Sequence, residues 1–238
     1  GYFATLDARD LSDRALEEQA RSLTGIGEVR LNEGNYKEAM TAFREAHART
    51  SALYQRQPEN GQRLFDLSQA QYWIGFVALQ QGRFEDARQW LVKYRDSTIK
   101  LAAMDRSNFA WQQEAAYGYH NIGALDFRMG KYQQAEQAMF AERELYTDWL
   151  KQRPNDFNLR YEAANIDSFL GSLMLEQGKL KEAESYYSAQ EDAMQRNRVE
   201  DPGNVKWKDI HTDAKRFLTK VQAMLGKRDQ AKGSALEA

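Results

Sequence analysis

The sequence predicts an all-α fold in which antiparallel helix hairpins stack into a solenoid. Only 3 prolines and 15 glycines interrupt the 238 residues, which favours long helices over a turn-rich fold. Apolar or small residues recur at helical spacing, as at Ala70, Ile74 and Val77. A glycine followed by Asn, Arg or Lys recurs every 48 residues, at Gly34, Gly82, Gly130, Gly178 and Gly226.

Alanines and large aliphatic residues keep the same step along the chain. A fixed period of this length is typical of an array of structural repeats. We therefore expect four full units and one partial unit, each a helical hairpin. The alanines are Ala39, Ala87, Ala135, Ala183 and Ala231, and the aliphatic residues are Ile26, Ile74, Ile122, Leu170 and Leu218.

Caps and turns then divide each unit into two helices. The first helix follows a side chain that can cap a helix N-terminus, and it ends at the glycine, which tolerates a left-handed backbone. The second helix ends before the next join, where three of the units carry proline. The capping residues are Ser12, Asn60, Asn108, Asp156 and Asn204. In chain order, we predict helices over 12–33, 36–57, 61–81, 84–105, 109–129, 132–153, 157–177, 180–200 and 205–225, and no strands.

The repeats predict one domain over residues 12–232. Its units are 12–59, 60–107, 108–155 and 156–203, with a partial unit at 204–232. Residues 1–11 then form an N-terminal flank and residues 233–238 a tail. Because the chain opens at Gly1 rather than Met, we expect it to be a piece of a longer protein or to begin with the remnant of a tag.

Composition excludes several classes of function. Lys and Arg number 33 against 35 for Asp and Glu, so there is no overall basic field to attract nucleic acid. No apolar run approaches the length of a membrane span, and we expect no membrane contact. The absence of cysteine excludes disulfides and thiolate metal sites. We expect a cytoplasmic protein, or a periplasmic one if a signal segment or anchor precedes the chain.

No motif in the sequence indicates catalysis. His47, His120 and His211 lie far apart, and no pair of histidines has the helical spacing of a zinc site. Glycine followed by lysine at Gly130 and Gly178 belongs to the repeat turn, because no phosphate-binding loop motif surrounds it. We therefore predict no catalytic residues, no metal and no cofactor.

The repeat resembles the tetratricopeptide repeat. Tyr119, Ile122 and Gly123 match the first half of its pattern, and Ala39 with Phe43 matches the second half. The resemblance covers residues 12 to about 231, although the period exceeds the usual 34 residues by about 14. It implies a right-handed superhelix whose concave groove is lined by the first helices and binds peptides. Long repeats of this kind are similar to those of multidomain bacterial signalling proteins.

Positions that vary between units predict the side chains of this groove. By the resemblance, they divide into apolar anchors and hydrogen-bonding groups. The anchors are Tyr72, Trp73, Phe76, Tyr117 and Phe169, and the hydrogen-bonding groups are His120, Asn121 and Asn165. Trp73 and Phe169 have an alternative role as packing residues, and we expect Trp111 and Trp207 to seal one unit on the next.

The function implied by the resemblance is a non-catalytic scaffold that binds a protein or peptide in the groove. The alternative is a regulatory sensor, in which a small ligand or signalling peptide controls an attached effector. A clamp for acidic C-terminal tails, known in chaperone-binding members of the family, is not expected, because only Asn121 matches its pattern. The identity of the partner and the oligomeric state are left open.

Overall fold

The computed structural model describes residues 11–227 and 229–231. In these residues the chain forms the nine helices α1 to α9, helical backbone again at 229–231, and no strand. Each end of α1 to α9 lies within one residue of its predicted position. The all-α prediction is therefore confirmed. The predicted tail at 233–238 and almost all of the flank at 1–11 lie outside the described residues. The helices are α1 (Asp13–Asn32), α2 (Tyr36–Arg56), α3 (Gly61–Gln80), α4 (Phe84–Met104), α5 (Phe109–Arg128), α6 (Tyr132–Gln152), α7 (Phe157–Glu176), α8 (Leu180–Glu200) and α9 (Val205–Met224).

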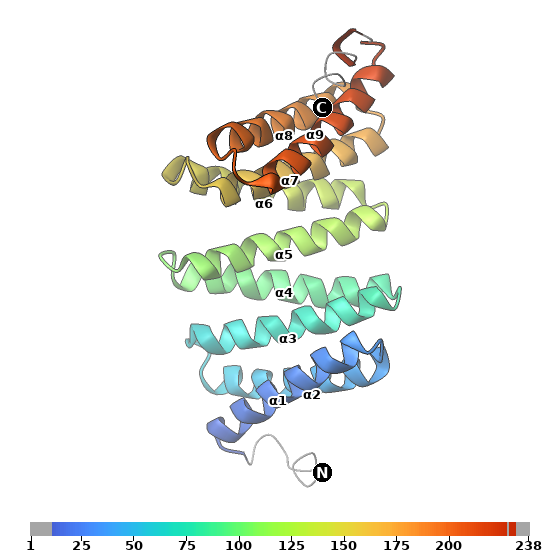
Figure 1. The fold of residues 1–238 in the computed structure, drawn as a ribbon. Helices are drawn as coiled ribbons and strands as arrows, with labels where there is room; N and C mark the ends of the chain where they lie inside the picture. Colours follow the sequence, from blue (N-terminus) through green and yellow to red (C-terminus); the bar gives the residue numbers. More distant parts are fainter. Residues whose placement is uncertain (1–10, 228, 232–238) are drawn as a thin grey trace. The chain divides into compact units, whose positions relative to one another are not determined.

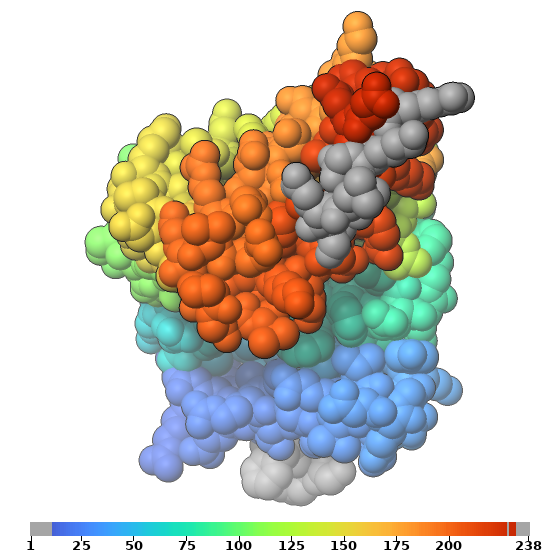
Figure 2. Space-filling view, turned by 45° about the horizontal axis from the view of Figure 1, so that its top comes forward, coloured from blue at the N-terminus to red at the C-terminus, as the bar shows by residue number. Residues whose placement is uncertain are grey.

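The chain divides into two compact units, Gly1–Leu125 and Asp126–Ala238. In the first unit, α1 to α4 pack in chain order, each helix against the next, and most of α5 belongs to the same unit. In the second unit, α6 to α9 pack in the same way (Figure 1). Figure 2 shows α8 and α9 side by side, in orange and red. The single repeat domain over 12–232 stays a prediction.

Side-chain caps fix the starts of the first helices. The Asn60 side-chain oxygen accepts hydrogen bonds from the backbone N–H groups of Gln62 and Arg63. Ser12 caps α1 in the same way, by accepting from Ala15 at 3.2 Å. The equivalent residues of α5, α7 and α9 also accept from their own first turns. Each cap contributes about 1 kcal/mol to stability.

The recurring glycines close the hairpins. All five have a positive φ, between 71° and 76°, which a residue with a Cβ adopts only at a cost. After Gly34, the N–H of Asn35 donates to the carbonyl of Arg30 at 2.8 Å, the bond of a Schellman motif. This bond satisfies a carbonyl at the end of α1 while the chain reverses into α2.

The two predicted seals are present within their units. Trp111 of α5 lies over Gly61 of α3, where a Cβ would overlap the indole ring. Trp207 of α9 is 2% exposed and lies against Phe157 and Tyr161 of α7. Large aromatic rings therefore close the contact between successive first helices in both units.

One face of α1 lacks the cover that equivalent faces receive. Ile26 is 47% exposed and Val29 is 55% exposed, whereas Ile74 and Val77, at the same repeat positions of α3, are fully buried. The reason is that α3 packs between α2 and α4, while α1 has no preceding helix in the described part of the chain. The sequence period predicts the apolar residues of α1 but not their exposure.

Candidate peptide-binding groove

A cleft of about 630 Å³ lies between the first helices of the first two hairpins. We call it the α1–α3 cleft. Five of its lining residues, Arg21, Thr24, Gly25, Glu28 and Gln69, lie at positions of the first helices that vary between units, and none of the predicted anchors is among the lining residues. The lining residues are Glu17, Ala20, Arg21, Thr24, Gly25 and Glu28 of α1, Thr50 and Leu53 of α2, and Gln62, Arg63, Asp66 and Gln69 of α3.

Three of the predicted anchors form one aromatic cluster on α3. The ring of Tyr72 lies 5.3 Å from that of Trp73 and 5.8 Å from that of Phe76. Tyr72 also contacts Tyr94 of α4, with 5.4 Å between ring centroids. Each of the three predicted anchors is half-buried, so one edge of the cluster remains open to solvent.

Trp73 has a packing role within this cluster. Its ring stacks on Phe43 of α2 at 5.2 Å, with an angle of only 3° between the planes. Because Phe43 is fully buried, Trp73 joins the α3 surface to the core of the preceding hairpin. The alternative interpretation of Trp73 as a structural residue therefore has direct support.

The most polar feature near these rings is the carboxylate of Glu114 on α5. Its Oε2 atom accepts a hydrogen bond from the Tyr94 hydroxyl at 2.7 Å and another from the Gln69 side-chain amide at 2.9 Å. Within the described residues, Glu114 forms no ion pair. Gln69 also lines the α1–α3 cleft, so Glu114 lies beside one end of that cleft.

The Glu114 carboxylate affects the pKa values of the nearby tyrosines. Burial raises the pKa of Tyr94, and the Glu114 carboxylate raises it further, so the hydroxyl stays protonated and acts as a donor. The same two causes raise the pKa of Tyr72. Tyr117 of α5 is close enough to influence the Tyr94 hydroxyl and is 44% exposed. We refer to Gln69, Tyr72, Tyr94, Glu114 and Tyr117 as the Glu114 cluster.

The other predicted residues of α5 lie on the same helix as Glu114. Asn121 is half-buried, and its side-chain amide donates to the Tyr117 carbonyl at 2.7 Å. This bond leaves the Asn121 side-chain oxygen available as an acceptor. His120 is half-buried.

Asn165 and Phe169 belong to the second unit. The ring of Phe169 lies edge-on to Phe127 at 5.2 Å, and the Asn165 amide makes a long contact of 3.4 Å with Glu162. The structure thus brings Tyr72, Trp73 and Phe76 into contact on α3 and joins Asn121 to Tyr117 on α5. His120 also lies on α5, while Asn165 and Phe169 lie on α7 of the second unit.

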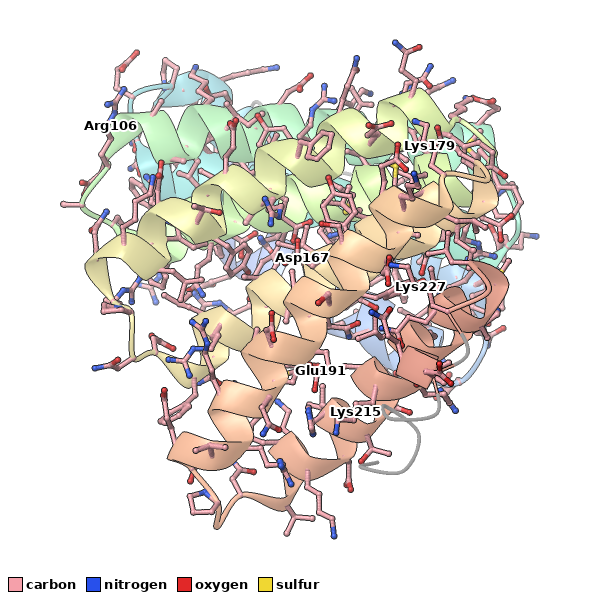
Figure 3. All side chains as sticks on the ribbon, turned by 90° about the horizontal axis from the view of Figure 1, so that it is seen from above. Arg106, Asp167, Lys179, Glu191, Lys215 and Lys227 are labelled. Carbon is pink, nitrogen blue, oxygen red and sulfur yellow. The ribbon has the colours of Figure 1, made fainter. Side chains whose placement is uncertain are left out.

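The second unit has its own cleft, of about 470 Å³, among α6, α7 and α8. Two of its arginines are already paired. Arg143 donates to Asp167 at 2.6 Å, and Arg160 bonds both Asn197 and Glu200. Figure 3 labels Asp167, at the middle of α7. Internal partners thus hold the charges of Arg143, Asp167 and Arg160 in this cleft.

Glu114 and Tyr94 are not among the residues predicted from the sequence. Tyr94 is only 3% exposed, and its hydroxyl donates to Glu114. An available signal for Glu114 is that an acidic residue recurs at the same position of four units. Constant apolar positions predict packing and variable positions predict the groove, but an acidic residue at a constant position belongs to neither class. The four residues are Glu18, Asp66, Glu114 and Glu162.

Two other kinds of site are absent from residues 11–227 and 229–231. No group of three or more His, Asp or Glu side chains there could hold a metal ion. None of the helices in this part of the chain is both long and apolar enough to cross a membrane.

The comparisons with known proteins agree with the fold. The family model of the tetratricopeptide repeat matches residues 20–46, within the α1–α2 hairpin. The structure is similar to that of BtubC (BKLC) from P. vanneervenii, with a TM-score of 0.66 and 16% identity over 93% of this chain and 84% of that chain. A putative kinesin light chain from Podosopora anserina, described as having nearly identical TPR-like repeats, gives a TM-score of 0.61 and 14% identity, covering 91% of each chain.

A third similar structure is a Rap conjugation gene regulator of the plasmid pLS20 in complex with the Phr* peptide. Its TM-score is 0.53 and its identity 15%, over 94% of this chain but only 54% of the Rap chain. A search among curated proteins found no significant match. The chain therefore carries a tetratricopeptide repeat at residues 20–46 and has the fold of tetratricopeptide-repeat proteins.

Proposed function

We propose that this chain is a non-catalytic scaffold that binds a protein or an extended peptide on the face formed by its first helices. The observation that carries the proposal is the half-open aromatic cluster of Tyr72, Trp73 and Phe76 on α3, the helix that also lines the α1–α3 cleft. The exposed Tyr117 lies on α5 of the same unit. Half-buried aromatic rings next to hydrogen-bonding groups are typical of the central anchors of protein interfaces.

Within this proposal the predicted residues have different roles. Tyr72, Phe76 and Tyr117 contact apolar side chains of the partner, while His120 and Asn121 bind its backbone or polar groups. Trp73 supports the other rings from below through its stacking on Phe43. Asn165 and Phe169 provide the contribution of the second unit. We further propose that residues 12–232 act as one repeat domain of a larger signalling protein.

A sensor function is the second candidate. It is favoured by the similarity to the Rap regulator, since that protein is in complex with the Phr* peptide. A sensor changes conformation when its ligand binds, whereas a passive scaffold keeps its shape. Small-angle scattering with and without bound peptide separates the two functions: a changed radius of gyration supports the sensor, and an unchanged one supports the scaffold.

The test of groove binding is a peptide-display selection followed by affinity measurement. A library of 12-residue peptides is selected against the wild-type chain, and the enriched peptides are measured by fluorescence anisotropy. Tyr72→Ala combined with Asn121→Ala is expected to weaken their binding by about 2 kcal/mol or more, roughly 30-fold. Failure to enrich any peptide contradicts the proposal.

A matched control variant separates loss of the site from general damage. Tyr54→Ala removes an aromatic ring from the second helix α2, where Tyr54 contacts Lys100 rather than the groove. We expect unchanged peptide affinity in this variant. Circular dichroism must show that all variants keep their helix content. If the double variant is folded and binds with wild-type affinity, the peptide binds to another surface of the chain.

A further inference from the structure

The carboxylate of Glu114 is a negative charge that the protein itself leaves unmatched. Both of its hydrogen-bond donors, the Tyr94 hydroxyl and the Gln69 amide, are neutral groups. Neutral donors hold the carboxylate in place but leave its full charge. In the described residues, no Lys, Arg or His forms an ion pair with it.

One oxygen of this carboxylate is left for a ligand. Both internal hydrogen bonds end on Oε2, so Oε1 accepts none from the described residues. Oε1 is also not among the buried side-chain atoms without a partner, so it keeps contact with solvent. The two hydrogen bonds to Oε2 therefore fix the orientation of the carboxylate, and Oε1 remains available to accept a hydrogen bond from a ligand.

The aromatic rings around the carboxylate suit a cation. Tyr72 and Tyr117 lie near the Tyr94 hydroxyl that binds Glu114, and Tyr117 is the more exposed of the two. The faces of tyrosine rings attract ammonium and guanidinium groups, and this attraction adds to that of a carboxylate. Such surroundings do not suit an acidic side chain, since Glu114 and the rings would both repel it.

Other charges near the cleft do not match this description. Arg63 forms an ion pair with Glu17, and Glu18, at the repeat position of Glu114 on α1, is exposed and paired with Arg14 at 2.9 Å. Asp66, at the same position on α3, has Arg63 and Arg21 close enough to lower its pKa, although burial raises the pKa overall. Glu114 thus combines an unmatched charge with an aromatic setting.

We infer that Glu114 and the rings of Tyr72 and Tyr117 form a subsite for one cationic side chain, lysine or arginine, of the bound partner. This inference rests on the proposed groove function and specifies the chemistry of the partner at one position. The charged hydrogen bond would form at Glu114 Oε1, while Tyr94 and Gln69 keep the carboxylate oriented.

The first test uses the displayed library and two forms of the protein. Selections are run in parallel against the wild-type chain and against Glu114→Gln, which keeps the size and acceptor of the side chain but removes its charge. We expect Lys or Arg at one fixed position of the wild-type peptides. Replacing that residue by norleucine should weaken wild-type binding about tenfold or more, and should change the affinity of Glu114→Gln little.

Glu18→Gln serves as the matched control, because it removes the same charge from the same repeat position, where Arg14 already pairs with it. It should leave both the selected sequences and their affinities unchanged. If Glu18→Gln weakens binding as much as Glu114→Gln, the effect is general electrostatic attraction and the subsite is refuted.

The second test uses small probes and does not depend on a selected peptide. N-acetyl-arginine methylamide, N-acetyl-lysine methylamide and the neutral norleucine analogue are titrated at millimolar concentration and followed through the tyrosine ring resonances in NMR spectra. Shifts of Tyr72 and Tyr117 with the cationic probes, but not with the neutral one, support the subsite. The two cationic arms also show whether lysine or arginine is preferred.

The outcomes separate this inference from the proposed function. If the library yields groove-binding peptides without a basic residue, and Glu114→Gln binds them as well as the wild type does, the subsite is wrong while the groove function stands. If no peptide binds but the cationic probes shift Tyr72 and Tyr117, the subsite stands and the peptide-binding function falls.

Discussion

The hairpin turns require single glycines with a left-handed backbone. Replacing Gly34 measures how much this requirement contributes to stability. With φ at 76°, alanine at this position forces a side chain into a conformation that costs about 1–2 kcal/mol. We expect Gly34→Ala to lower the free energy of unfolding by roughly this amount, although no atom would contact the new Cβ. Urea denaturation followed by circular dichroism measures the change.

Gly25 provides a control of opposite sign. It lies inside α1, and an added Cβ there would also meet no atom within 4 Å. Because alanine favours a helix interior over glycine, Gly25→Ala should stabilise the chain by up to about 1 kcal/mol. If both variants shift stability in the same direction, backbone conformation does not determine the effect.

The half-buried imidazole of His47 makes stability depend on pH. Burial lowers the pKa of His47, and the positive charge of Lys93 lowers it further. In the folded state the ring therefore releases its proton at a lower pH than in the unfolded state. This contribution to stability is fully present above the unfolded pKa, near 6.5, and is lost as the pH falls through the folded pKa.

We therefore expect the wild type to lose more unfolding free energy than His47→Gln when the pH is lowered from 7.5 to 5.5. The comparison cancels the contributions of other titrating groups, which are the same in both chains. Urea denaturation at both pH values measures the difference. Equal losses in the two chains would show that His47 titrates alike in the folded and unfolded states.

At the scale of helix pairs, the order of opposite charges at one pair of repeat positions differs between α6–α7 and α8–α9. Arg143 of α6 donates to Asp167 of α7, whereas the same repeat positions on α8 and α9 carry Glu191 and Lys215 (Figure 3). Asp167 and Lys215 are both buried, at 8% and 6% exposed. Burial raises the pKa of Asp167 although Arg143 opposes the shift, so this carboxylate depends on its arginine.

Reversing the first pair tests this dependence. Arg143→Glu should cost about 2 kcal/mol, less than for a fully buried pair, because the Arg143 side chain is 41% exposed. Adding Asp167→Lys gives the charge order found at Glu191 and Lys215 and should recover at least about 1 kcal/mol. Chemical denaturation of the single and double variants gives the coupling. Lys151→Glu, in an exposed pair with Asp148, is the control and should cost under about 1 kcal/mol.

The same helix pairs show what sequence reasoning can and cannot predict. Helix ends follow from local chemistry, the cap at Asn60 or the turn at Gly34, and these are readable without a structure. The Glu114 cluster is different, because its donors come from α3 and α4 while the carboxylate comes from α5. Whether Tyr94 reaches Glu114 depends on how three helices pack, which no local pattern specifies.

At the scale of the second unit, α9 covers one face of α8. Phe217 stacks on the buried Tyr187 at 5.5 Å, and His211 bonds Glu191 at 2.7 Å. Deleting residues 204–238 uncovers this face of α8 and removes Trp207 from α7. We expect a loss of at least about 3 kcal/mol in unfolding free energy, based on the buried aromatic area that is exposed.

Differential scanning calorimetry and light scattering test the truncated chain at several concentrations. A lower Tm together with concentration-dependent aggregation is the expected result, since an uncovered solenoid end associates readily. Equal stability and a strictly monomeric state would show that α9 does not protect α8 in solution.

The uncovered face of α1 has a consequence for protein engineering. Ile26 and Val29 occupy the positions at which α3 carries buried residues, so α1 has an exposed apolar face that can pack against one more helical hairpin. A tandem duplicate of residues 12–59, inserted immediately before Ser12, would place the second helix of the new copy against this face. Because neighbour contacts in such arrays contribute almost additively, the lengthened chain should be more stable than the original. The first hairpin is thus a building block from which longer binding surfaces can be assembled.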